Sequence, residues 1–146
     1  MTSLIPLDSK KHKNHKVKKA HNFSFANKDN LCPIILAELN HLIPQTPIIF
    51  AKNENAGYEL CSLQGLDAGQ NCFVSKEGQW KANYIPSKYR SYPFIMALEQ
   101  NSQKKILCFH SETTLIVDDE NAQGAKLFND DSSPSDFTQK MLAFLN

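Results

Sequence analysis

The 146-residue chain lacks any long hydrophobic run. Its apolar stretches, such as residues 34–37 and 47–51, fall far short of the roughly 20 residues that cross a bilayer. Residues 1–7 are too short for the apolar core of a secretory signal, and the basic run follows them instead of preceding them. These absences predict a cytoplasmic chain without a membrane span, which a dedicated exporter would have to carry to the cell surface.

The chain has no C-x-x-C pair among its 4 cysteines. Cys32, Cys61, Cys72 and Cys108 lie in apolar or strand-like settings, which favours a reducing compartment and a role as small core residues. The alternative concerns Cys108 and His110, which share one face of a strand because they are two residues apart. A thiolate beside an imidazole is the arrangement of a nucleophile or of two metal ligands.

Glycine is scarce, with 5 residues in the chain. The loop over residues 65–71 has neither the glycine spacing of a dinucleotide site nor a following Gly-Lys-Ser/Thr. No glycine-flanked serine elbow is present either. The sequence therefore predicts no catalytic residue, no metal and no cofactor.

The charges present are distributed unevenly. Six of the 16 basic residues lie between Lys10 and Lys19, which leaves the remainder of the chain at about −5. Residues 112–136 carry seven carboxylates against Lys126 alone. The two regions could attract each other or a neighbouring copy, and the negative remainder argues against specific nucleic-acid binding.

The hydrophobic share of 41% and the charged share of 21% suit a globular protein of one domain. Residues 1–22 are interpreted as an extended basic leader, and residues 23–146 as a single domain. The pattern predicts an α+β fold, a mainly antiparallel sheet with one helix near residues 33–43 and a C-terminal helix near residues 134–145. Alternation around Phe23 and Phe25 predicts a short strand that docks both rings, and further strands are expected over residues 48–51, 58–63, 72–74, 94–98, 105–109 and 114–117.

Residues 80–94 are the densest aromatic and cationic stretch. Their rings and cations suit a platform for a small anionic or aromatic ligand, with candidate binding residues Trp80, Tyr84, Tyr89, Arg90 and Tyr92. The alternative is that the rings pack a corner of the fold while Arg90 pairs with a carboxylate.

Two further clusters invite a metal interpretation. His12, His15 and His21 offer imidazoles, but the lysines around them repel a dication. The leader could instead contact an acidic polymer, an anionic membrane surface or the acidic region after Glu112. The run that begins at Asp118 lacks the spaced ligands and the glycine of a calcium loop.

The chain resembles the SapC family of bacterial proteins from its leader almost to its end. The stretches that carry the resemblance are residues 5–7, His12 with Asn14 and Val17, residues 23–26, Pro33 with residues 37–39, residues 47–50, 65–66 and 71–73, Gly78-Gln79-Trp80, Tyr84-Ile85-Pro86, Tyr89-Arg90, Tyr92-Pro93-Phe94, and residues 127–130.

The resemblance implies a non-enzymatic protein that associates with a surface layer or interacts with the cell envelope. Envelope or surface-layer components are then the expected partners, and no catalytic residue is carried over. Proteins of this family usually continue into a further helical segment, so the chain resembles their amino-terminal portion. The alternative function is that of a small-molecule-binding or accessory domain that uses residues 80–94.

Overall fold

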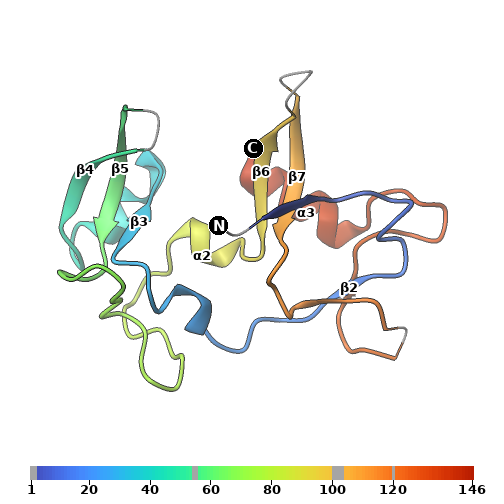
Figure 1. Ribbon diagram of the computed structural model, residues 1–146, viewed down its shortest axis with the longest axis horizontal. Helices are drawn as coiled ribbons and strands as arrows, with labels where there is room; N and C mark the ends of the chain where they lie inside the picture. Colours follow the sequence, from blue (N-terminus) through green and yellow to red (C-terminus); the bar gives the residue numbers. More distant parts are fainter. Residues whose placement is uncertain (1–2, 54–55, 100–103, 120) are drawn as a thin grey trace. The chain divides into compact units, whose positions relative to one another are not determined.

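The computed structural model describes residues 3–53, 56–99, 104–119 and 121–146. The chain forms two units, the first made of Met1–Ala20 with Ser91–Asn146 and the second of His21–Arg90. Figure 1 shows their elements, which comprise three small antiparallel sheets and short helices. The α+β class predicted from the sequence is confirmed, although the strands are divided among separate sheets.

The first unit contains two of the three sheets. One has the order β1-β7-β6, from β1 (Leu4–Pro6), β7 (Lys105–His110) and β6 (Phe94–Leu98). The other has the order β8-β2-β9, from β8 (Ile116–Val117), β2 (Lys16–Val17) and β9 (Ala125–Lys126). Each sheet therefore joins a strand of the basic leader to strands from the second half of the chain.

The C-terminal helix α3 (Asp136–Leu145) packs on the first unit's core, close to its expected position. It begins where the Ser135 hydroxyl accepts a hydrogen bond from the Thr138 N–H at 3.2 Å, an ordinary N-cap. The Phe137 ring lies 5.7 Å from that of Phe94 on β6. Leu127 is fully buried in this core.

The basic leader contacts the acidic region of the chain. His15 Nδ1 lies 3.8 Å from an Asp118 carboxylate oxygen, and the Lys16 ammonium donates to the Ala122 carbonyl at 3.1 Å. The pKa of Asp131 is lowered, chiefly by hydrogen bonds from Ser133 and to a smaller extent by the charge of Lys13. The leader therefore contacts the region after Glu112 of its own chain, which is one of the contacts expected from the sequence.

The second unit is built on a sheet of order β3-β5-β4. Its strands are β3 (Leu31–Pro33), β5 (Tyr58–Leu63) and β4 (Ile48–Lys52), and β4 pairs with β5 as the sequence predicts. The expected strand over residues 72–74 is reduced to an isolated bridge between Val74 and Trp80. Four short helices complete the described part of the unit: the 3₁₀ helices η1 (Ser24–Ala26) and η2 (Leu36–Glu38), α1 (Leu39–Leu42), which directly follows η2, and α2 (Ser87–Arg90).

The expected strand around Phe23 and Phe25 is wrong, because that segment forms η1 instead. The Ser24 N–H donates to the Asn22 side chain at 3.2 Å, and the Phe23 N–H donates to the Gly78 carbonyl at 2.7 Å. A local bond to a side chain, such as that to Asn22, competes with the backbone hydrogen bonds that a strand would make to a neighbouring strand. Both phenylalanine rings still dock, since they pack against the core of the second unit.

The helix expected near residues 33–43 begins later than its proline suggests. Pro33 ends β3, where it lies opposite Cys61, and helical structure starts at Leu36. Proline is tolerated there because β3 is an edge strand and needs no N–H on its outer side. The shift places Glu38 at the junction of η2 and α1.

Candidate functional site

The aromatic and basic segment is divided between the two units. Trp80, Tyr84, Tyr89 and Arg90 belong to the second unit, whereas Tyr92 belongs to the first. Tyr92 stacks there on His110, with ring centroids 5.7 Å apart and an interplanar angle of 22°. Four of the five candidate residues thus share one unit.

Trp80 and Tyr89 contribute to the core of the second unit. The Trp80 ring lies 5.5 Å from the Tyr89 ring and 5.7 Å from the Phe73 ring, and its indole N–H donates to the Tyr84 carbonyl at 2.9 Å. Tyr89 is buried, and burial raises the pKa of its phenol. Both rings therefore hold this part of the fold together.

Glu38 is the centre of the site, and the sequence analysis did not identify it. Only 2% of this residue is exposed. One carboxylate oxygen accepts the Ser87 N–H at 2.6 Å and the Tyr84 hydroxyl at 3.1 Å. The other accepts the Ser87 hydroxyl at 2.8 Å and the Ile35 N–H at 3.2 Å. A buried carboxylate needs such a set of donors, because loss of hydration otherwise disfavours its charge.

Arg90 supplies the positive charge that faces Glu38. Its Nη2 lies 3.8 Å from a Glu38 oxygen and donates to the Tyr84 hydroxyl at 2.9 Å. The guanidinium carbon lies 5.2 Å from the centre of the Tyr84 ring, and the His41 ring stacks on Tyr84 at 4.7 Å. Burial and the neighbouring Glu38 raise the pKa of Tyr84. This arrangement agrees with the second interpretation of residues 80–94, in which Arg90 pairs with a carboxylate of the protein itself.

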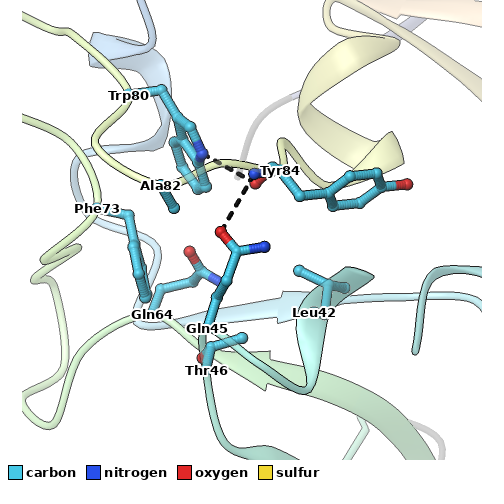
Figure 2. Close-up of a pocket in the computed structure, with 8 residues that line it drawn as sticks. All are labelled: Leu42, Gln45, Thr46, Gln64, Phe73, Trp80, Ala82 and Tyr84. Carbon is cyan, nitrogen blue, oxygen red and sulfur yellow. Dashed lines mark hydrogen bonds between the residues drawn. The ribbon is translucent and has the colours of Figure 1, made fainter. Parts of the chain in front are cut away.

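A hollow opens beside these residues, as Figure 2 shows. Its space of about 170 Å³, which includes space open to solvent, is lined by Leu42, Gln45, Thr46, Gln64, Phe73, Trp80, Ala82 and Tyr84. The Gln45 side-chain oxygen already accepts from the N–H groups of Asn83 and Tyr84, at 2.7 and 3.2 Å. The geometry thus favours packing over ligand binding, and ligand binding by Trp80, Tyr84, Tyr89, Arg90 and Tyr92 stays a prediction.

Cys108 and His110 lie two residues apart on β7, as expected. Cys108 is 2% exposed, and burial raises the pKa of its thiol. A nucleophilic cysteine needs the opposite, an accessible thiol of lowered pKa. His110 stacks on Tyr92 instead of activating a thiolate.

His12 fixes a turn of the leader in the first unit. The buried imidazole accepts the Asp8 N–H at its Nδ1 at 3.0 Å, and the His12 N–H donates to the Asp8 carbonyl at 2.8 Å. The ring also meets the His15 and Phe109 rings edge-on, at 5.0 and 5.3 Å. Among the residues that the structure describes, no group of three or more metal-ligating side chains is assembled.

Acid is expected to destabilise this histidine turn. Burial and the nearby His15 lower the pKa of His12 below its ordinary 6.5. The unfolded chain then binds a proton that the folded chain does not, so the free energy of unfolding falls as the pH drops below about 6.5. Urea denaturation between pH 7 and pH 5 should show that fall, and His12→Gln should reduce it. His21→Gln, at an exposed position, is the control, and an equal slope in wild type and His12→Gln would contradict the expectation.

Large apolar side chains are exposed mainly in the second unit. Among the described residues, seven are at least 59% exposed; one of them, Leu98, belongs to the first unit, and the other six are Ile35, Leu36, Ile43, Phe50, Tyr58 and Leu66. Phe50 and Tyr58 lie on the β4–β5 hairpin, on the same face, because Phe50 lies opposite Leu60 and Lys52 lies opposite Tyr58. The unit therefore presents apolar surface that its own core does not use.

Comparison with known proteins identifies one family. The family model described as SapC matches residues 7–146. No curated protein and no solved structure matches the chain. Among the described residues, no helix is long and apolar enough to cross a membrane.

Proposed function

The chain belongs to the SapC family, and we propose that it is a non-enzymatic protein that docks onto a component of the bacterial envelope or surface layer. The surface-layer association implied by the family resemblance supports the envelope as the place of docking. The exposed apolar side chains of the second unit support protein contact as the means.

The observation that carries this proposal is the set of six large apolar side chains exposed by the second unit, the most exposed of them at 88%. Burying apolar surface contributes about 25 cal/mol for each Å² removed from water. Exposed apolar surface marks sites of protein contact where it is contiguous. A partner that covers Leu36, Ile43 and their neighbours would gain this free energy.

The Glu38 cluster supports a non-catalytic role. Its carboxylate accepts four hydrogen bonds from the protein and faces Arg90. A general acid or base must reach substrate to act, whereas this carboxylate is enclosed by its own donors. We therefore assign Glu38 a structural role, in which its hydrogen bonds hold η2 and α1 to the segment around Tyr84 and Ser87.

Co-sedimentation with a purified envelope fraction tests the proposal. The wild-type chain should pellet with the fraction, and the double variant Leu36→Asn/Ile43→Asn should bind at least about ten-fold more weakly, since about 1.4 kcal/mol of lost contact has this effect. Leu98→Asn is the matched control, because Leu98 is an apolar residue of similar exposure in the first unit. A wild type that stays in the supernatant, or equal binding by all three proteins, would overturn the proposal.

A further inference from the structure

The outer edge of strand β4 carries backbone hydrogen-bonding groups that no other described strand uses. β4 lies at the end of the β3-β5-β4 order, and among the described residues no strand pairs with its other side. Figure 1 shows this strand at the margin of its sheet. Such an edge is a ready template for another strand.

The bonds to β5 identify the residues that point outward. The Leu63 N–H donates to the Pro47 carbonyl, and the Asn53 N–H donates to the Gly57 carbonyl, both at 2.9 Å. Antiparallel partners alternate between bonded and non-bonded pairs. Pro47, Ile49, Ala51 and Asn53 therefore bond inward, whereas Ile48, Phe50 and Lys52 turn their N–H and C=O groups to the open edge.

The side chains of β4 do not protect this edge. Natural edge strands usually carry a charge or a proline within the exposed stretch. Here Pro47 precedes the strand and Lys52 ends it, so the centre, Ile48 to Ala51, is entirely apolar. Phe50, at the middle of the strand, is 74% exposed.

We propose that β4 pairs antiparallel with β4 of a second copy of the chain, with Phe50 opposite Phe50. This register is two-fold symmetric and self-complementary, the commonest geometry of homodimers. In this register Ile48 of each copy lies opposite Lys52 of the other. The outward N–H and C=O groups of Ile48, Phe50 and Lys52 then all find partners across the new pair of strands. The result is a continuous sheet across the two copies.

Charge distribution favours a second copy as the occupant. Each Lys52 lies opposite an isoleucine, and the two lysines are separated by roughly 14 Å along the strands, four residues at 3.4 Å each. No like charges face each other, and the apolar centres coincide. The two Phe50 side chains emerge on the same face, with Cα atoms about 5.5 Å apart, each beside its own Leu60. An unrelated extended peptide would need a matching apolar centre, which a second copy already has.

Disulfide capture tests this register in the full chain. The exposed Cys72 is first changed to serine, and Phe50→Cys is then introduced. Its Cα separation across the dimer suits a disulfide, so mild oxidation should convert most of the protein to a covalent dimer. Leu66→Cys is the control, since that position is 88% exposed but lies outside β4. Equal cross-linking of both variants, or none for Phe50→Cys, would overturn the proposal.

Sedimentation equilibrium provides a second measurement without introduced thiols. The wild type should show the mass of two chains, and Phe50→Lys should show that of one, because it places two lysines opposite each other. Leu66→Lys should remain dimeric, and a wild type that is monomeric at all concentrations would contradict the pairing. The proposed pairing would also be contradicted if an unrelated peptide paired with β4 while the chain itself stayed monomeric. Both experiments use purified protein without envelope, so their outcome is separate from that of the co-sedimentation test.

Discussion

Replacing Glu38 with leucine is expected to lower the free energy of unfolding by about 2–5 kcal/mol, because each buried donor that loses its acceptor costs about 1–3 kcal/mol. The variant leaves the N–H groups of Ser87 and Ile35 without their acceptor. It also leaves the Arg90 guanidinium without its carboxylate. Urea denaturation followed by the fluorescence of Trp80, the single tryptophan of the chain, measures the loss close to the site.

Two variants control this experiment. Glu38→Gln keeps the shape and one oxygen but turns an NH₂ toward donors, so a smaller loss of about 1–3 kcal/mol is expected. Glu59→Leu removes an exposed carboxylate from β5 of the same unit, and a change within about 0.5 kcal/mol is expected. If Glu38→Leu unfolded with the same free energy as Glu59→Leu, the described role of the cluster would be wrong.

Leu127→Ala is expected to have a comparable effect in the first unit. Leu127 is 0% exposed and packs among Val17, Phe94, Leu107 and Phe109. Removing its buried methyl groups leaves a cavity, which typically costs about 2–5 kcal/mol. Cys108 is buried in the same unit, so a thiol reagent reaches it only when that unit unfolds. The rate at which the reagent labels Cys108, determined by peptide mass spectrometry, should therefore rise in Leu127→Ala.

Leu98→Ala is the control for this change. Leu98 belongs to the same unit but is exposed, so its truncation should leave the Cys108 labelling rate within about two-fold of the wild type, equivalent to a change below about 0.5 kcal/mol. If the thiol reagent labelled Cys108 as slowly in Leu127→Ala as in Leu98→Ala, the placement of Leu127 in the core would be contradicted.

The elements predicted best from the sequence are those whose pattern is local. The apolar runs within residues 94–98 and 105–109 identify β6 and β7, because each contains a short run of apolar residues and the polar residues 99–103 lie between them. Ser135 and the apolar stripe that follows likewise identify α3. Alternation around Phe23 misleads, because Asn22 and Gly78 supply bonds that a pattern of hydrophobicity does not contain.

The site shows the same limit more clearly. Arg90 and Tyr84 are prominent in the sequence, and the pairing of Arg90 with a carboxylate is one of the two interpretations that the sequence supports. The identity of that carboxylate depends on contacts 46 and 49 residues apart, between Glu38 and the segment around Tyr84 and Ser87. A glutamate within an apolar helical stripe was the available signal, since a charge so placed needs partners when it is buried.

The place of the native protein in the cell tests the proposed envelope function most directly. Intact cells that make the chain are treated with an external protease, and the protein is then measured in the envelope and cytoplasmic fractions, with a cytoplasmic marker to control for lysis. The proposed docking at the surface predicts an envelope-bound protein that the protease removes while the marker survives. A protein that remains in the cytoplasmic fraction and survives with the marker would contradict it.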